Sequence, residues 1–185
     1  MRKITICNGK GGSGKTTATI LLGLALVEAG HKTKVLDIDP QNTASRWITD
    51  GALPLDSEDS SATVLIDTPP RLDNPDLKKS IRDSDIIIVV SSPSPADLFT
   101  SQDTAQLIGE LKAAGKTRLL FNQVQEGTIL SRGLEETAKR IGIRPLNSVL
   151  TRRQCYQHAV LLGWNALPPK AKEEVFKIAL EVASL

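Results

Sequence analysis

A glycine-rich stretch near the start of the chain, residues 8–17, constrains the fold more than any other feature of the sequence. It reads Asn-Gly-Lys-Gly-Gly-Ser-Gly-Lys-Thr-Thr, follows a short apolar run and precedes a helical pattern that begins near Lys15. The spacing of Gly9, Gly14, Lys15 and Thr16 matches a phosphate-binding loop between a strand and a helix. Glycines let the backbone wrap closely around an anion, so that several N–H groups at the helix N-terminus point at the phosphates.

The side chains of this loop have expected tasks in holding a nucleotide. Lys15 is expected to reach the β- and γ-phosphates, and the Thr16 hydroxyl is expected to hold Mg²⁺. We expect the nucleotide to be bound by Gly9, Lys10, Gly11, Gly12, Ser13, Gly14, Lys15, Thr16 and Thr17. A glycine-rich turn that binds nothing is the alternative, which the strand–loop–helix context disfavours. Lys10 is unusual because it places a second lysine inside the loop.

The composition is that of one globular domain spanning residues 1–185. The chain is long enough for a sizeable core, and 40% hydrophobic and 24% charged residues are ordinary values for such a domain. A net charge of +2 is too small to indicate a nucleic-acid partner, so any DNA affinity would have to come from a local basic patch. Cys7 falls in a buried-strand pattern, where cysteine acts as a small hydrophobe.

Membrane and export signals are absent from the sequence. No apolar run reaches the length of a membrane span, and the N-terminus enters a strand at once without the pattern of a signal peptide. Residues 182–185 lack the combination of Lys or Arg beside bulky apolar residues that a membrane-anchoring helix needs. We therefore expect a cytoplasmic protein with no membrane partner.

Apolar runs alternate with helical patterns along the whole chain. Besides the run before the loop, strands are predicted at residues 34–39, 62–67, 85–91, 117–121 and, more weakly, 145–149. Helices are predicted at residues 15–30, 43–50, 74–83, 96–114, 130–141, 154–162 and 170–183. Continuous apolar strands separated by helices predict an α/β fold, in which a mostly parallel twisted sheet is flanked by helices. Ligands of such sheets bind at the carboxyl ends of the strands.

Three acidic residues stand at the ends of predicted strands. Asp67 closes its strand where an acid that holds Mg²⁺ through a bound water is expected, and a turn-forming Asp is the alternative. Asp37 and Asp39 alternate along their strand, so their side chains would point to the same face. Two carboxylates beside a triphosphate repel unless Mg²⁺ and a water compensate. We assign Asp37 to the metal and Asp39 to orienting the attacking water; alternatively, Asp39-Pro40 only starts a turn.

Several motifs together resemble one known family. Residues 10–17 resemble the deviant Walker A box of the ParA/MinD ATPases, with its signature lysine in first place. Residues 35–41, Val-Leu-Asp-Ile-Asp-Pro-Gln, resemble the second motif in its ParA form, and residues 65–70 resemble the Walker B strand. Residues 92–98 and 150–156 further resemble small plasmid partition ATPases of the ParF kind. The resemblance covers essentially the whole chain and implies the three-layer P-loop NTPase fold.

The resemblance implies a nucleotide-dependent switch. Family members bind ATP and Mg²⁺, pair as a homodimer around two ATP molecules, and in that state bind DNA without sequence preference. A ParB-type centromere-binding or adaptor protein then stimulates slow hydrolysis, which releases the dimer from the nucleoid and moves plasmid or chromosome cargo. Lys10 is expected to reach across the dimer, because a cation supplied in trans can add about 10³–10⁵ in rate. A solvent-exposed loop lysine is the alternative.

The base and DNA contacts are further expectations. Asn122 follows the strand at 117–121, where the family often places a purine-reading Asn, and a capping role is the alternative. By analogy with the small partition ATPases, the backbone of residues 150–153 lies against the adenine. Candidates for DNA contact are Arg152, Arg153, Lys170, Lys172 and Lys177. The alternative is that these are ordinary solvated helix faces; phosphate-only binding would depend steeply on salt.

The chain departs from the family in two respects. The connection from Pro40 to the strand at 62–67 is too short for an extra strand and helix that many relatives carry, which puts partner docking in doubt. The DNA-binding N-terminal extension of larger plasmid partition proteins is not expected here.

Other functions on the same scaffold stay open. One is a positioning ATPase of the same mechanism with a protein cargo, which the sequence hardly separates from a partition ATPase. Another is a metal-cluster carrier or reductase, which needs paired cysteines that Cys7 and Cys155 do not offer. A small-molecule kinase or synthetase would need a substrate motif that we do not find.

Overall fold

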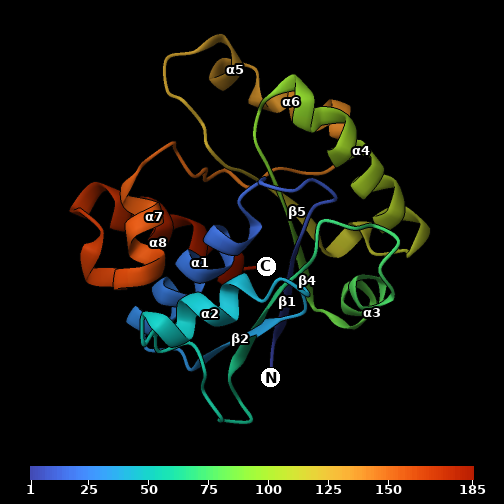
Figure 1. Ribbon diagram of the computed structural model, residues 1–185. Helices are drawn as coiled ribbons and strands as arrows, with labels where there is room; N and C mark the ends of the chain where they lie inside the picture. Colours follow the sequence, from blue (N-terminus) through green and yellow to red (C-terminus); the bar gives the residue numbers. More distant parts are fainter.

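The computed structural model describes residues 1–185, which fold around a five-stranded sheet whose strands all run parallel (Figure 1). The sheet contains β1 (Lys3–Cys7), β2 (Thr33–Asp37), β3 (Thr63–Asp67), β4 (Ile86–Ser91) and β5 (Thr117–Phe121), in the order β2-β3-β1-β4-β5. Because β1 is the central strand, the loop that follows it leaves from the middle of the sheet, at the carboxyl ends of the strands.

Helices cover both faces of this sheet (Figure 1). One face carries α1 (Lys15–Glu28), α2 (Thr43–Asp50), α7 (Cys155–Leu162) and α8 (Pro169–Ala183). The other carries α3 (Pro75–Asp83), α4 (Pro95–Glu110) and α6 (Leu134–Ile141), which the short α5 (Ile129–Arg132) precedes. Short 3₁₀ turns are η1 (Ala114–Lys116) and η2 (Trp164–Ala166). This confirms the predicted three-layer α/β fold. None of the helices is both long and apolar enough to cross a membrane.

Each face of the sheet has its own hydrophobic cluster. The larger cluster surrounds α1 and includes Ile20 and Leu21, and the smaller one lies under α3, α4 and α6 and includes Ile87 and Phe121. Sheets covered on both faces need apolar side chains on both faces of their central strands, which explains the continuous apolar run of β4. Helix α1 packs against α7, α8 and the sheet, so the loop at its N-terminus sits on a buried support.

The weak strand predicted at residues 145–149 does not form, and this expectation was wrong. Pro145 forms an isolated bridge with Leu119 of β5, and the Leu146 N–H donates to the Leu119 carbonyl at 2.8 Å, but no continuous ladder forms. Helix α8 supplies carboxylate acceptors instead: Glu181 accepts hydrogen bonds from the N–H groups of Asn147, at 2.7 Å, and Ser148, at 3.0 Å. Because backbone N–H groups in a packed segment need acceptors, the Glu181 side chain takes the place of a strand partner for Asn147 and Ser148.

Three predicted element boundaries also need correction. The helix predicted at 130–141 is divided at Gly133, whose backbone leaves the helical region at φ −101° and ψ 18°. The helix predicted at 96–114 ends at Glu110, and Lys112 beyond it has a left-handed φ of 56°. The strand predicted at 34–39 ends at Asp37, because the chain turns there toward α2.

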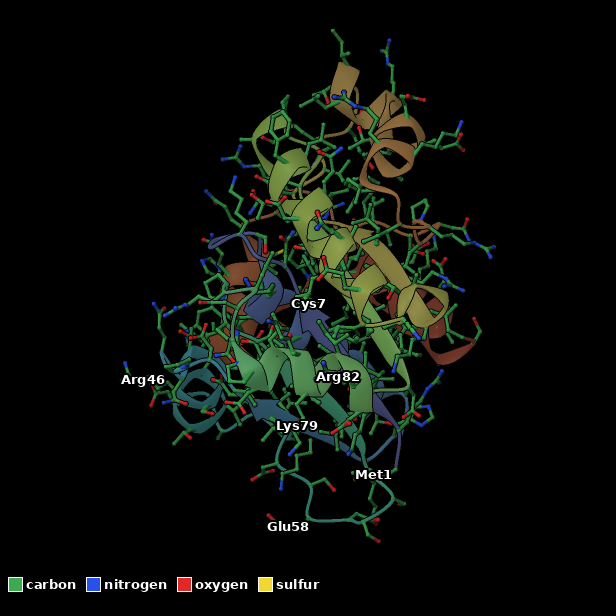
Figure 2. The ribbon with its side chains drawn as sticks, turned by 90° about the vertical axis from the view of Figure 1, so that its right-hand side faces the viewer. Met1, Cys7, Arg46, Glu58, Lys79 and Arg82 are labelled. Carbon is green, nitrogen blue, oxygen red and sulfur yellow. The ribbon has the colours of Figure 1, made fainter.

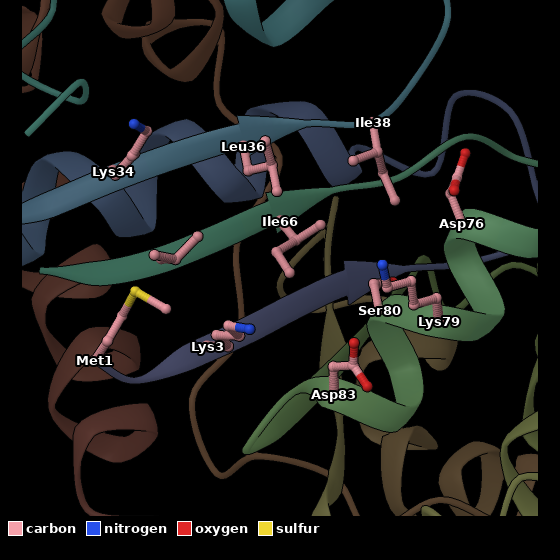
Figure 3. Close-up of a pocket in the computed structure, with 11 residues that line it drawn as sticks. Met1, Lys3, Lys34, Leu36, Ile38, Ile66, Asp76, Lys79, Ser80 and Asp83 are labelled. Atoms are coloured by element: carbon pink, nitrogen blue, oxygen red, sulfur yellow. The ribbon is translucent and has the colours of Figure 1, made fainter. Parts of the chain in front are cut away.

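The short connection between β2 and β3 leaves part of one sheet face without a covering helix. Figure 2 views the molecule from this side, with α3 in front of the sheet and Lys79 on it. A cavity of about 430 Å³ lies between α3 and the sheet face formed by β1, β2 and β3. Figure 3 shows Leu36 and Ile38 from the β2 side and Ile66 from β3 standing beside α3. Leu36 is 45% exposed, so this cavity is an open surface groove, and none of its lining residues belongs to the glycine-rich loop.

Candidate nucleotide-binding site

Buried polar side chains hold the first half of the glycine-rich loop. The Asn8 amide donates to the carbonyl of Val90, at 2.8 Å, and to the Ser101 hydroxyl, at 3.1 Å. The Gly9 N–H donates to the Thr104 hydroxyl at 3.1 Å. Helix α4 therefore fixes the point at which the loop leaves β1. We had not singled out Ser101 or Thr104 in the sequence, where polar positions three residues apart on a helix are an ordinary pattern.

Asn122 holds the second half of the loop. Its side-chain N–H donates to the Ser13 carbonyl at 3.0 Å, and its side-chain oxygen accepts from the Gln123 N–H at 2.8 Å. Gly14 has a φ of 91°, and a Cβ there would lie 2.0 Å from the Asn122 amide nitrogen. Only glycine fits such a position. Asn122 thus supports the loop, and its role as a base-reading residue stays a prediction.

Lys15 is buried directly beneath the loop. Its ammonium donates to the Lys10 carbonyl at 3.0 Å, the one hydrogen bond that its ammonium makes. Burial lowers the pKa of Lys15, and the nearby Asp67 carboxylate opposes that shift. A buried cation with so few partners is compensated well by an anion within the loop. This arrangement suits a phosphate group.

Asp67 and two threonines form the expected metal-holding corner. The Thr16 hydroxyl donates to one Asp67 oxygen at 2.8 Å, and Thr19 donates to the other at 3.3 Å. Burial raises the pKa of Asp67 to about 6, and the Asp37 charge adds to this, while the Thr16 hydrogen bond opposes it. A cation at this corner would favour the ionised carboxylate.

Asp37 and Asp39 accept backbone hydrogen bonds between the end of β2 and the start of α2. The strand pattern did not predict these contacts. Asp37 lies beside Asp67 in the register of β2 and β3. Its carboxylate accepts from the N–H groups of Asp39 and Ser45, both at 3.0 Å, so it orders the turn and the N-terminus of α2. Asp39 lies beyond β2 and accepts from Gln41 N–H at 3.0 Å. The expectation that both side chains extend from one strand was wrong, and their metal and water roles stay predictions.

Lys10, the other lysine of the loop, forms an ion pair within its own chain. The Lys10 ammonium forms an ion pair and hydrogen bond with the carboxylate of Asp97, in the first turn of α4. Asp97 is 4% exposed, whereas the Lys10 side chain is 35% exposed. The Ser92 N–H donates to the second Asp97 oxygen at 3.3 Å. We had not assigned a role to Asp97, although it falls within one of the motifs singled out in the sequence.

A pocket of about 170 Å³ adjoins the C-terminal end of the loop. Gly14 and Thr17 form one side of it, and the segment at 151–157 forms the other. Its lining residues are Gly14, Thr17, Asn122, Gln123, Thr151, Arg152, Arg153, Tyr156 and Gln157. The structure therefore brings the phosphate loop, Asn122 and the predicted adenine-side segment together at one place.

The residues present fit a magnesium nucleotide. The Ser13 hydroxyl is buried in the loop without a hydrogen-bond partner in the chain, as expected of a group that would bond to a polar ligand. Nowhere in the chain do three or more His, Cys, Asp or Glu side chains gather into a metal cage. Mg²⁺ is commonly held by one or two protein oxygens together with phosphates and waters. Thr16 and Asp67 supply that kind of partial site.

The candidate DNA-contacting cations differ in whether another side chain of the same chain pairs with them. Arg153 pairs with Glu174 at 3.3 Å, and the Lys172 ammonium lies 5.6 Å from the centre of the Trp164 ring. Lys177 pairs with Glu173 one helical turn away. The two remaining candidates, Arg152 and Lys170, are exposed and form no ion pair.

The fold and the loop define a P-loop nucleotide-binding protein. Residues 4–163 match the family described as the CobQ/CobB/MinD/ParA nucleotide binding domain. The chain belongs to this family, and the resemblance to the ParA/MinD ATPases is confirmed.

Known relatives resemble the chain over most of its length. The maintenance of carboxysome distribution protein A of Halothiobacillus neapolitanus is 26% identical, over 86% of this chain and 84% of that protein. Protein ParA of Rhizobium radiobacter is 21% identical, over 99% of this chain and 93% of that protein. A putative plasmid partition protein from Borrelia burgdorferi, bound to AMPPNP, superposes with a TM-score of 0.79 at 16% identity, covering 99% and 98% of the two chains. That structural likeness concerns the fold.

Proposed function

We propose that this chain is a ParA-type ATPase that binds Mg²⁺ and ATP and pairs as a homodimer. Hydrolysis of ATP then releases the dimer from DNA. The observation that carries the proposal is the joint placement of buried Lys15 and the Thr16–Asp67 pair around one glycine-rich loop. These groups supply phosphate binding and metal binding at the same point. Lys10 belongs to the same loop, and its side chain is partly exposed.

The protein's own groups divide the work of hydrolysis. The loop N–H groups and Lys15 would hold the β- and γ-phosphates, while Thr16 and Asp67 would hold the cation, with Asp37 beside them. Mg²⁺, when bound there, would supply positive charge that offsets the charge of the phosphates. Asp39 orients the water that attacks the γ-phosphate. Lys10 leaves Asp97 and places its charge at the phosphates of the partner subunit, which makes turnover depend on pairing.

DNA binding is proposed for the ATP-bound dimer, through cations that the chain does not neutralise. Arg152 and Lys170 are exposed and without ion pairs, so they are the strongest of the sequence candidates. A dimer doubles such a patch, and contacts to phosphate alone carry no sequence preference. We therefore propose that the ATP-bound form associates with the nucleoid.

Two kinds of cargo are compatible with this switch. One is a plasmid or chromosome carried by a ParB-type partner; the other is a protein assembly. The second candidate is favoured by the resemblance to a carboxysome distribution protein, and the first by the resemblance to a ParA protein. Deleting the gene separates them: loss of a plasmid from dividing cells supports DNA cargo, and clustering of a protein assembly with normal plasmid retention supports protein cargo.

Phosphate release from ATP tests the enzymatic part of the proposal. With Mg²⁺, the protein should release phosphate slowly, and Lys15→Ala should release none, because the buried cation that faces the phosphates is lost. Lys32→Ala is the matched control, since Lys32 forms an exposed ion pair with Asp59. Release that is equal in the wild-type protein and Lys15→Ala would contradict the proposal.

A further inference from the structure

The Glu174 carboxylate on α8 accepts several hydrogen bonds from residues 151–156, which form one side of the pocket beside the loop. Glu174 accepts hydrogen bonds from the Thr151 N–H, at 2.5 Å, and from the Thr151 hydroxyl, at 2.9 Å. It also accepts from the Tyr156 hydroxyl at 2.6 Å and from the Arg153 guanidinium at 3.3 Å. Its side chain is 14% exposed. All three partner residues line the 170 Å³ pocket.

The other anchor of this segment is backbone pairing with the turn after β5. The Arg152 N–H donates to the Val124 carbonyl at 2.9 Å, next to the isolated bridge between Val124 and Thr151. That pairing sets the path of the main chain on one side only. Glu174 holds the other side, and Tyr156, which is buried, joins α7 to the same carboxylate. Burial and the Glu174 hydrogen bond raise the pKa of Tyr156, which keeps the phenol protonated as a donor.

We propose that Glu174 is a positioning residue that shapes the base side of the nucleotide site and so contributes to selection of a purine nucleoside triphosphate. The proposal rests on the proposed nucleotide binding. A segment already fixed by its acceptor loses little freedom when a base lies against it, and preorganisation of this kind favours binding. Removing the carboxylate leaves the Thr151 N–H and the Tyr156 hydroxyl without their acceptor, which is unfavourable for partly buried donors.

The base and the phosphates can be tested separately with two probes. We expect Glu174→Ala to weaken binding of Mg²⁺-ATP about tenfold or more, and to reduce the preference for ATP over CTP, which carries a pyrimidine base. Binding of inorganic tripolyphosphate, which has no base, should change less than about twofold, because the loop and Lys15 are untouched. Glu174→Gln keeps the side-chain volume and Tyr156→Phe removes a single donor; both should weaken ATP binding by smaller factors. Isothermal titration calorimetry measures all of these affinities.

Glu173→Gln is the matched control, because Glu173 is the neighbouring helix residue, is exposed and pairs with Lys177 away from the pocket. It should bind both probes as the wild-type protein does. The proposal is overturned if Glu174→Gln and Tyr156→Phe bind ATP with wild-type affinity. It is also overturned if they lose affinity for ATP and tripolyphosphate in equal proportion, which is a general loosening of the fold. A wild-type protein that binds neither probe would instead contradict the proposed nucleotide binding.

Discussion

The ammonium of Lys10 is paired with the carboxylate of Asp97, which lies 87 positions further along the same chain. Asp97 is buried, so its charge is stabilised by the partners that the fold supplies, Lys10 and the Ser92 N–H. A lysine held in this way is unavailable to a neighbouring subunit. If Lys10 acts on the nucleotide of a partner, pairing of two chains must break this contact, which makes Asp97 a determinant of when the dimer forms.

Replacing Lys10 tests its role in pairing. Lys10→Ala should bind ATP nearly as the wild-type protein does, because Lys15 and the loop N–H groups remain. ATP-dependent dimerisation and partner-stimulated turnover should both be lost. Light scattering with ATP and with ADP measures the dimer, with Lys32→Ala as the surface control. Unchanged dimerisation of Lys10→Ala would remove Lys10 from the interface.

Replacing Asp97 should have the opposite effect on pairing. Asp97→Asn keeps an oxygen that can accept from Ser92, and it removes the charge that retains Lys10. The variant should dimerise at a lower ATP concentration, by about fivefold for a partly exposed ion pair worth about 1 kcal/mol. In a Lys10→Ala background the same change should have no effect on pairing. Weaker dimerisation in Asp97→Asn would show instead that Asp97 aims the lysine correctly.

Replacing Asp39 should separate pairing from hydrolysis. Asp39→Ala removes the carboxylate proposed to orient the attacking water, while the loop, Lys10 and the metal-holding corner remain. The variant should accumulate as an ATP-bound dimer that releases phosphate at least about 100-fold more slowly, a typical loss for a positioned base. Size-exclusion chromatography with phosphate release measures both quantities. Turnover at the wild-type rate would exclude Asp39 from this role.

The metal-free protein should become less stable as the pH rises past the pKa of Asp67. Burial raises the pKa of Asp67 in the folded chain to about 6, from an ordinary value near 3.8. The folded state therefore binds this proton more tightly than the unfolded state does. Its contribution is full below about pH 4 and is lost as the pH rises through 6, by up to about 3 kcal/mol.

Asp67→Asn provides the comparison for this pH effect. Urea unfolding in chelator at pH 4 and pH 7 should show that the wild-type protein loses more stability over this interval than the variant. The difference between the two proteins isolates Asp67 from the other carboxylates. Equal pH dependence in both proteins would contradict the burial argument.

The parts of this molecule that follow from local sequence were predicted well. The alternation of apolar runs and helices predicted the parallel sheet, because strands buried on both faces have no polar side. The loop could be predicted because its glycines, Lys15 and Thr16 are contiguous and lie between β1 and α1. Asp67 could be placed because parallel strands bring their carboxyl ends to one edge.

The features that sequence reasoning missed depend on contacts between distant parts of the chain. No residue close to Asp97 in the sequence indicates that it pairs with Lys10. No role was assigned to Glu174 or Glu181 from the sequence, and both accept hydrogen bonds from the segment after α6. That segment has the composition of a strand, but carboxylates of α8 accept from the N–H groups of Asn147, Ser148 and Thr151, while Leu146 and Leu150 donate to β5. Asp39 was misplaced because Asp37 accepts its N–H and ends the strand early.

If ATP is the switch for DNA binding, the most direct test is binding to a nonspecific DNA duplex with ATP, with ADP and without nucleotide, at low salt and again at higher salt. We expect binding with ATP only, which weakens steeply as salt rises and is absent in Lys10→Ala. Binding of equal strength in all three nucleotide conditions, or none in any, would contradict it.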